Sequence, residues 1–305
     1  MAPQAHPDSE KRVKAPWFEY QAPRTLKEGL EALRDAGPDG RVLAGGQSLM
    51  PMLNMRIAAP THLIDINRIE TLNHLTVEGD MLRIGALVRH ADVLRSKKIR
   101  EGWPLLTEAT TQVAHLAIRN RGTVCGSISH NDPAAEHPSI LATYDGSVVI
   151  ASTEGTREVP ADAFSDGMMS TILEPGEMVI EVRYPRPAAG AGQAFVEYAR
   201  RLGDFAVAGA AAILEVREGK CARARLTVVG MGDGPFRAAG AEDLLIGAEM
   251  DASTSAELFA AAAAKVMDEV DPAEDVHASS GYRRHLAGVL TKRALATAFA
   301  RTGSV

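Results

Sequence analysis

Cysteine is scarce in this chain of 305 residues, which contains only Cys125 and Cys221. Two cysteines so far apart exclude a disulfide-stabilised scaffold and a self-contained iron–sulfur cluster with four cysteine ligands. No run of about 18 apolar residues occurs, so we expect no membrane span. The net charge of −6 gives no basic footprint for nucleic acid. We therefore expect a cytoplasmic protein with reduced thiols.

The familiar short motifs of nucleotide and metal sites are also missing. Neither the G-x-G-x-x-G fingerprint nor the P-loop pattern occurs, and the nine histidines lack the spacing of metal ligands. No nucleophile and base stand in a recognisable arrangement. Residues 1–15 are polar and lack the apolar centre of a secretory signal, so we expect a loose tail there. These absences suit a protein whose bound cofactor carries the chemistry.

The first informative stretch runs from Arg41 to Met50. Three apolar residues, 42–44, predict a short buried strand, and the pair Gly45-Gly46 predicts a tight turn after it. Glycine lets a backbone approach another group closely, and a turn of exposed N–H groups can bind an anion. Gln47 and Ser48 could add donors to the same anion. The alternative is an ordinary turn between a strand and a helix.

A second stretch, residues 119–136, also places glycines beside small hydroxyl groups. Gly122-Thr123 and Gly126-Ser127 both have this character. We interpret the stretch as a second loop, so that the two loops could hold a diphosphate from both sides. Asp132-Pro133 then predicts the start of a helix, because proline is favoured in a first helical turn and aspartate before it.

One helix is clearly marked just before the first glycine stretch. Thr25 and Glu28 have the spacing of a capping box, three leucines share one face, and Gly37-Pro38 ends the helix. Elsewhere in the first half the apolar periodicity indicates further elements. The expected strands are 17–20, 62–66, 82–87, 147–151 and 178–184, and the expected helices are 90–94 and 103–118.

The second half predicts three strands followed by three helices. The strands are 195–199, 205–216 and 222–229, and the helices are 241–245, 255–268 and one from about residue 281. Strands followed by helices indicate an α+β domain. We place the domain boundary near Glu174, which gives domains of residues 16–174 and 175–305.

Several of these stretches together resemble one protein family. Ala44–Pro51, Thr123–Ser127 and Asp132–Glu136 are similar to motifs in the FAD-binding medium subunit of molybdenum hydroxylases, the family of the carbon monoxide dehydrogenase medium chain and the xanthine dehydrogenase flavin domain. Glu174–Pro185, Arg200–Ala206 and Tyr282–Leu286 resemble its domain junction and C-terminal domain. The resemblance implies an α+β fold: a two-subdomain FAD-binding domain of the vanillyl-alcohol-oxidase type, then a smaller C-terminal domain of antiparallel sheet plus helices.

The resemblance also implies a function within a complex. A large subunit would carry the molybdenum cofactor, and a small subunit would carry two [2Fe-2S] clusters. The medium subunit would take electrons from those clusters onto FAD and pass them to an external acceptor. Such complexes are expected to be dimers of heterotrimers. The scarcity of cysteine agrees with clusters that lie on another chain.

The resemblance carries over to particular positions. The first diphosphate motif matches Ala44, Gly45, Gly46, Gln47, Ser48 and Leu49; the second matches Thr123, Gly126 and Ser127; Asp132 and Glu136 match its acids; and Val179 and Phe195 match residues near the isoalloxazine. This chain departs from the family pattern at Cys125, usually glycine, at Ser127, usually asparagine, and at Glu136, commonly aspartate. Plain core packing is the alternative for Val179 and Phe195.

Two other functions remain open from the sequence. A free-standing flavoprotein oxidoreductase of the same fold would need an acid or base above the flavin, and no convincing one stands out. A nucleotide-binding scaffold without redox function would be consistent with the departures at Cys125, Ser127 and Glu136. The substrate and the electron acceptor are not encoded in any motif of this chain.

Overall fold

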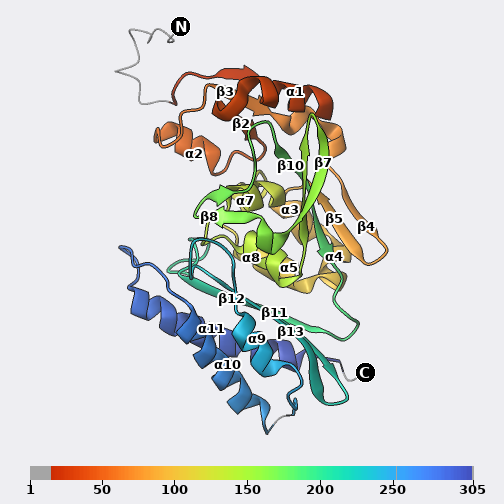
Figure 1. Cartoon of the computed structure of the whole chain (residues 1–305), viewed down its shortest axis with the longest axis vertical. Coiled ribbons are helices and arrows are strands. Elements are labelled where there is room, and N and C mark those ends of the chain that lie inside the picture. The colour runs from red at the N-terminus through yellow and green to blue at the C-terminus, as the bar shows by residue number, and fades with distance from the viewer. Residues whose placement is uncertain (1–14, 252, 304–305) are drawn as a thin grey trace.

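The computed structural model describes residues 15–251 and 253–303, so most of the predicted tail, 1–15, lies outside the described residues. Three tiers follow one another from the N-terminal to the C-terminal part of the chain (Figure 1). The first two tiers, residues 15–185, are called here the first body, and residues 192–303 the second body. None of the described helices combines the length and apolarity needed to cross a bilayer.

The first tier is a small parallel sheet with two helices. Its strand order is β1-β3-β2. The elements are β1 (Glu19–Gln21), α1 (Leu26–Ala36), β2 (Gly40–Leu43), α2 (Leu49–Asn54) and β3 (His62–Asp65). The predicted capping box is present: the Thr25 hydroxyl accepts from the Glu28 N–H, and the Glu28 carboxylate accepts from the Thr25 N–H. Local sequence therefore fixes the start of α1.

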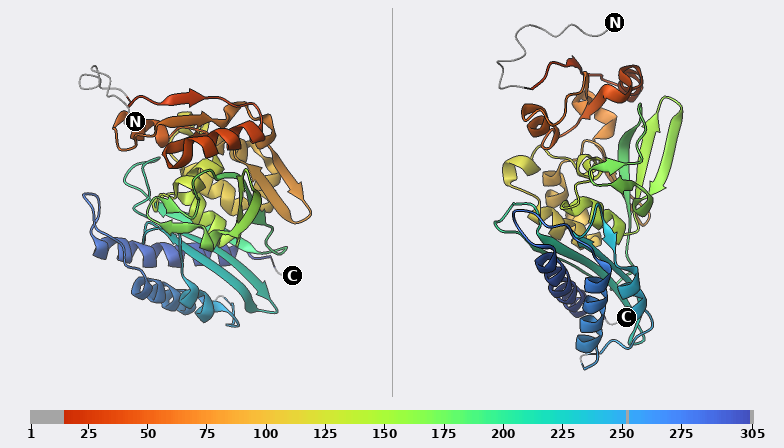
Figure 2. Two further views of the ribbon diagram at one scale, coloured as in Figure 1. Left: turned by 45° about the horizontal axis from the view of Figure 1, so that its top comes forward. Right: turned by 60° about the vertical axis from the view of Figure 1, so that its left-hand side comes forward.

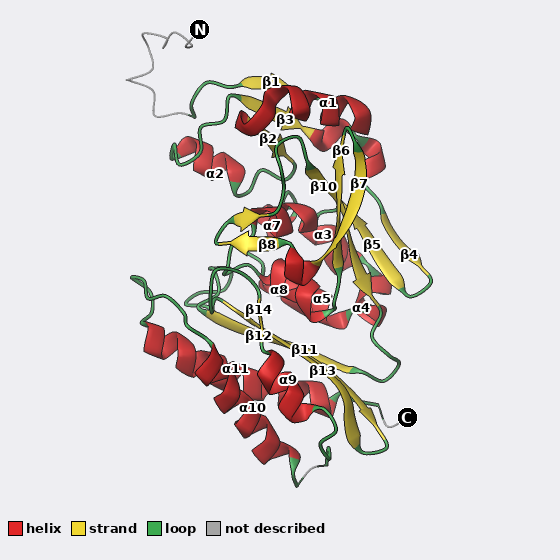
Figure 3. Cartoon of the chain, viewed as in Figure 1, coloured by secondary structure: helices red, strands yellow, loops and turns green. Residues whose placement is uncertain are grey.

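The second tier is an antiparallel sheet covered by helices. Five strands lie in the order β4-β5-β10-β6-β7 (Figure 3). The strands are β4 (Leu75–Glu78), β5 (Met81–Gly85), β6 (Ser147–Ser152), β7 (Gly155–Pro160) and β10 (Met178–Pro185), with the separate pair β8 (Ser165–Gly167) and β9 (Ser170–Thr171). The helices are α3 (His90–Arg95), α4 (Lys97–Gly102), α5 (Pro104–Gln112), α6 (Leu116–Arg119), α7 (Val124–His130) and α8 (Glu136–Thr143).

The pairing of β10 differs from the domain assignment made from the sequence. The boundary near Glu174 would place this strand in the C-terminal domain. In the structure β10 pairs with β5 on one side and β6 on the other, in the middle of the first body's sheet. The chain passes to the second body only in the loop 186–191, which the sequence marks with its prolines, alanines and glycines.

The third tier is an antiparallel sheet between two layers of helices. Its strand order is β11-β12-β13-β14. The elements are β11 (Gly192–Tyr198), β12 (Ala208–Arg217), β13 (Lys220–Val229), β14 (Phe236–Arg237), α9 (Ala239–Leu245), α10 (Ser255–Glu269) and α11 (Ser280–Ala300). Helices α5 and α8 of the first body cover one face, and α11 covers the other (Figures 2 and 3). Because both faces are covered, Ala208–Leu214 of β12 is buried throughout.

Two predictions about helices in the first body are wrong. The helix expected over 103–118 is two helices, α5 and α6, because Ala114 has a positive φ of 41° that ends the helical path. The helix expected to begin at Asp132-Pro133 begins at Glu136 instead. The Asp132 carboxylate accepts from the Ala134 N–H at 2.9 Å, which makes a turn before the helix rather than a helix cap.

Candidate cofactor-binding site

The first glycine stretch forms the turn that the sequence predicts. Strand β2 ends at Leu43, Gly46 has a φ of +71°, and helix α2 begins at Leu49. Within the described part of the chain, the backbone N–H groups of residues 45–48 have no hydrogen-bond partner. The Gln47 amide donates to the Gly45 carbonyl at 3.0 Å and so stiffens the turn. A row of free N–H donors on a stiff turn is suited to an anion.

The two glycine stretches meet at Gly45. A Cβ added to this buried residue would lie 2.5 Å from the Arg121 carbonyl oxygen and 2.7 Å from the Gly122 Cα. Such distances leave room for glycine alone, because real Cβ atoms do not approach backbone so closely. The structure therefore brings together the turn after β2 and the start of the second stretch, which are more than seventy positions apart in sequence.

The second stretch, residues 119–136, is not the single loop that the sequence suggested, because residues 124–130 form helix α7. Thr123 caps helix α7, because its hydroxyl accepts from the Gly126 N–H at 3.1 Å. Gly126 and Ser127 lie in the first turns of that helix. A Cβ at Gly126 would come within 2.6 Å of the Thr123 hydroxyl oxygen, so this glycine serves the cap. The prediction of a second loop at 126–127 is corrected to a capped helix.

The departure at Cys125 has no backbone cost. This residue is helical and is not among the residues with positive φ. It is buried, and burial raises the pKa of its thiol above the ordinary value, so the thiolate is disfavoured. The residue packs as a small apolar side chain in the hydrophobic core of the first body.

A network beneath the first stretch involves two residues that the sequence did not single out. The Asn67 amide donates to the Ala44 carbonyl at 2.8 Å and to the Asp65 carboxylate. The half-buried Arg89 donates to the Arg121 carbonyl and to the Asn67 side-chain oxygen. Among the described residues no carboxylate forms an ion pair with the Arg89 guanidinium. Burial lowers the pKa of Arg89. A positive charge thus stands beside the free N–H groups, where it favours an anion.

Two stacked histidines lie behind Gly122. The rings of His90 and His137 are 4.7 Å apart and nearly parallel. Burial lowers the pKa of His90 to about 4 and that of His137 below its usual value, so both rings are neutral. A Cβ at Gly122 would lie 2.8 Å from the His90 ring, so the rings support the second stretch by close packing. No motif could reveal this pair, because the two residues belong to different helices.

The two acids of the second motif differ in environment. Asp132 is half-buried in the turn before α8. Glu136 is the first residue of α8 and is only 7% exposed. Burial raises the pKa of Glu136 to about 7, and the nearby charge of Asp132 acts in the same direction.

Of the two apolar site residues, one is buried in the core of the first body and the other is partly buried against it. Val179 is buried in β10 opposite Ile150, and Phe195 of β11 packs against the same first core. The Phe195 N–H donates to the Glu108 carboxylate of α5 at 3.1 Å. Both positions agree with plain packing, and Phe195 is contributed by the second body.

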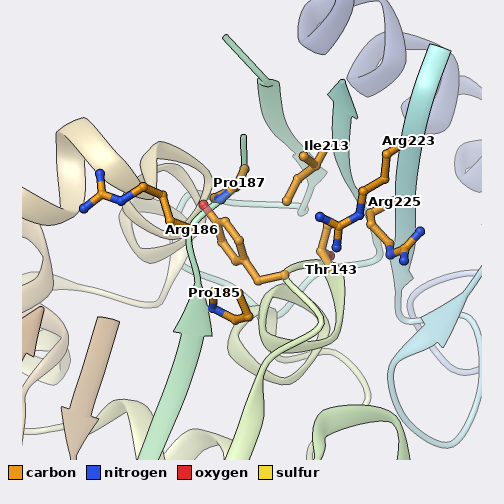
Figure 4. Close-up of a pocket in the computed structure, with 8 residues that line it drawn as sticks. Thr143, Pro185, Arg186, Pro187, Ile213, Arg223 and Arg225 are labelled. Atoms are coloured by element: carbon orange, nitrogen blue, oxygen red, sulfur yellow. The ribbon is translucent and has the colours of Figure 1, made fainter. Parts of the chain in front are cut away.

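One hollow lies apart from the glycine stretches. It is lined by residues 143–144 of the first body, the end of β10 with the loop after it, and three residues of β12 and β13 (Figure 4). Its cavity volume is about 10 Å³, about the room that one water molecule needs. Its arginines are already engaged, since Arg223 and Arg225 both bind the Asp145 carboxylate. The hollow is therefore a small gap at the contact between the bodies and does not suit a dinucleotide.

Comparison with known proteins agrees with this architecture. A family model described as the FAD binding domain in molybdopterin dehydrogenase matches residues 16–187, and one described as the CO dehydrogenase flavoprotein C-terminal domain matches residues 193–298. The chain therefore belongs to the family of FAD-binding medium subunits of molybdenum hydroxylases, and it is an FAD-dependent oxidoreductase subunit. The resemblance inferred from the sequence motifs is confirmed.

Individual relatives match nearly end to end. The 6-hydroxypseudooxynicotine dehydrogenase complex subunit alpha of Paenarthrobacter nicotinovorans is 41% identical over 95% of this chain and 97% of its own. The carbon monoxide dehydrogenase medium chain of Hydrogenophaga pseudoflava is 36% identical over 94% of this chain and 98% of its own.

Two solved structures have the same fold. A structure of carbon monoxide dehydrogenase from H. pseudoflava superposes with a TM-score of 0.91 at 38% identity, covering 95% of this chain and 99% of that chain. Quinoline 2-oxidoreductase from Pseudomonas putida 86 superposes with a TM-score of 0.88 at 36% identity. The match covers 94% of this chain and 98% of that chain. The fold of an FAD-binding domain followed by a C-terminal domain is thus shared with the medium subunit of carbon monoxide dehydrogenase.

Proposed function

We propose that this chain is the FAD-binding electron-transfer subunit of a heterotrimeric molybdenum hydroxylase. A small subunit with two [2Fe-2S] clusters delivers electrons to its FAD, and an external acceptor removes them. A large subunit with the molybdenum cofactor oxidises the substrate. Family membership supports this division of labour, and so does the chain itself, since two buried cysteines cannot hold the clusters.

The observation that carries the proposal is the close approach of Gly45 to residues 121–122. It brings the free N–H groups close to the Arg121 carbonyl, to which Arg89 donates, and Arg89 forms no ion pair with a carboxylate among the described residues. No lysine of a P-loop is involved. The residues present therefore fit a dinucleotide diphosphate. FAD, when bound, would supply the ability to accept electrons one at a time from the clusters and to pass them on to the acceptor singly or in pairs.

The chain's own residues then have distinct tasks. The turn formed by Ala44, Gly45, Gly46, Gln47, Ser48 and Leu49 donates N–H groups to the diphosphate. That turn is the first wall of the binding site, and Thr123, Gly126 and Ser127 form the second wall. Asp132 and Glu136 bind hydroxyl groups of the cofactor. Val179 and Phe195 lie near the isoalloxazine. Arg89 adds the neutralising positive charge. Neither wall contains a general acid or base, which suits electron transfer rather than bond chemistry on the protein.

Several finer properties belong to the same proposal. The two tiers of the first body correspond to the two subdomains of a vanillyl-alcohol-oxidase-type FAD domain, and the loop 186–191 is the domain boundary. The complex is cytoplasmic and assembles as a dimer of heterotrimers. The large subunit selects the substrate, because it carries the molybdenum cofactor at which the substrate is oxidised.

The test is to purify the complex through a tag on this chain and to identify the released nucleotide. We expect one FAD per chain, iron–sulfur absorbance, and co-purifying large and small subunits. Bleaching of the flavin band upon substrate addition to the complex would support electron transfer through this chain. FAD on a lone chain that turns over a small organic substrate would instead show a free-standing oxidoreductase. Absence of flavin from both forms would overturn the proposal.

A further inference from the structure

Strand β11 forms one edge of the sheet in the second body, because it pairs with β12 alone. On an edge strand, the backbone groups of every second residue point away from the neighbouring strand. The Phe195 N–H and the Gln193 carbonyl are two such groups, since both bond to side chains outside the sheet. An edge of this kind needs a cover, because free backbone groups invite another strand to add to the sheet.

One side chain from each body covers this edge. The Glu108 carboxylate of α5, in the first body, accepts from the Phe195 N–H at 3.1 Å. Its other oxygen binds Arg301 Nη1 at 2.6 Å, and the same Nη1 donates to the Gln193 carbonyl at 2.6 Å. The ion pair therefore accepts one hydrogen bond from β11 and donates another to it, as a neighbouring strand would.

The end of the last helix holds Arg301 in place. Arg301 directly follows α11, and its own N–H donates to the Ala298 carbonyl at 3.0 Å. Strand β11 begins against the same turn, since a Cβ added at Gly192 would lie 1.8 Å from the Ala298 carbonyl oxygen. The end of α11 thus fixes where β11 starts, and the Arg301 side chain reaches from there to Glu108 in the first body.

The side chains of the same two strand residues also contact the first body. The Tyr144 hydroxyl donates to the Gln193 side-chain oxygen at 2.6 Å, and the Phe195 ring packs against the core of the first body. Phe195 is therefore held through its backbone by Glu108 and through its ring by the core. Its position depends on contacts that cross between the two bodies.

We propose that Glu108 is a positioning residue of the cofactor site, which fixes the part of β11 that carries Phe195 against the first body. The inference rests on the proposed function, which places Phe195 near the isoalloxazine. Glu108 acts on the flavin through Phe195 and does not touch the cofactor itself. The side chains of Glu108 and Arg301 are 33% and 45% exposed, and such ion pairs add little to stability. Loss of the carboxylate should therefore change the surroundings of the flavin more than the stability of the fold.

Another carboxylate, that of Asp145, crosses the same contact without bonding to a site residue. It belongs to the first body and accepts hydrogen bonds from Arg223, Arg225 and Arg237 of the second body. These arginines lie on β13 and β14, which β12 separates from β11. Asp145 therefore offers a matched comparison, because it joins the two bodies as Glu108 does but at a distance from Phe195 in the sheet.

The experiment uses the complex purified through a tag on this chain, with its FAD removed and titrated back. For Glu108→Ala we expect the FAD dissociation constant to rise about fivefold, as for the loss of one hydrogen bond. The visible circular dichroism of the bound flavin should change, and the melting temperature should stay nearly the same. Glu108→Gln keeps an oxygen that can accept from the Phe195 N–H, so it should restore most of the affinity and of the spectrum. Glu108→Met replaces the alanine variant if that variant does not fold.

Asp145→Asn is the matched control. It should lower the melting temperature, because three arginines lose a charged partner, and leave the FAD dissociation constant and the flavin spectrum as in the wild type. Wild-type affinity and spectrum in Glu108→Ala would overturn this inference alone, and so would equal changes of the flavin in the alanine variant and the control. A complex whose wild-type form binds no FAD would overturn the proposed function instead.

Discussion

The two glycine stretches are similar in composition but fold in different ways. The first, at residues 45–48, is an open turn whose N–H groups have no partner among the described residues. The second, from Thr123, is a capped helix in which the Gly126 N–H is already bonded to a side chain. The comparison shows that small residues alone do not define an anion site. What matters is whether the backbone donors remain free after local structure has formed.

The glycines of the two stretches also serve different purposes. Gly45 permits the approach of another backbone, and Gly46 permits a positive φ. Gly122 and Gly126 make room for the His90 ring and for the Thr123 hydroxyl. The first stretch is therefore expected to govern cofactor affinity, and the second mainly to govern stability.

Gly45→Ala should have the largest effect. Its Cβ would lie 2.5 Å from the Arg121 carbonyl oxygen, so the two stretches would have to separate. Overpacking of this kind costs about 3 kcal/mol, equivalent to about a hundredfold in affinity. Isothermal titration calorimetry of the apoprotein with FAD measures the loss of affinity. Wild-type affinity in this variant would show that the two stretches do not act together.

Gly46→Ala should weaken FAD binding by about tenfold, because a left-handed residue with a Cβ costs about 1–2 kcal/mol. The matched control is Gly79→Ala in the turn between β4 and β5. Gly79 has a similar φ of +59°, but a Cβ added there would meet no atom within 4 Å. The control should lose similar stability and retain FAD. Equal losses of FAD in both variants would remove the special role of the first stretch.

Thr123→Ala should act on stability more than on binding. It removes the N-cap of α7, and such losses cost about 0.5–2 kcal/mol in free energy of unfolding. Thr123→Ser keeps the hydroxyl and should restore most of the loss. Chemical denaturation of the apoprotein measures the effect. If alanine lowered FAD affinity without lowering stability, the second stretch would be a binding loop after all.

Ser127→Ala should have the smallest effect. Its hydroxyl has no hydrogen bond within the described residues, and alanine favours a helix, so stability should stay the same or rise slightly. If the hydroxyl contributes one hydrogen bond to FAD, affinity should fall about fivefold, from a contribution of about 1 kcal/mol. Unchanged affinity would remove Ser127 from the site.

Features with a local cause could be predicted from the sequence. The capping box of α1, the turn at Gly45-Gly46 and the strands 147–151 and 178–184 all appear as expected. Helix α7 was missed because its seven residues include a glycine and two serines, which are weak helix formers, and its cap lacks the glutamate of a capping box.

The deeper parts of the site depend on contacts that no local pattern encodes. Asn67 and Arg89 reach the first stretch only because the tiers pack together. The place of β10 was missed for a similar reason, since pairing with two distant strands decides which sheet a strand joins.

The burial of both cysteines gives the chain a practical property. Burial raises the pKa of Cys125, and it raises the pKa of Cys221 to about 11, so neither forms a thiolate readily at neutral pH. Maleimide dyes will therefore leave the folded wild-type chain unlabelled. A single cysteine introduced into the turn at Gly79, and a second at the exposed Leu202, would each accept one dye. Distance changes between the first and second bodies can then be followed by fluorescence without removing either native cysteine.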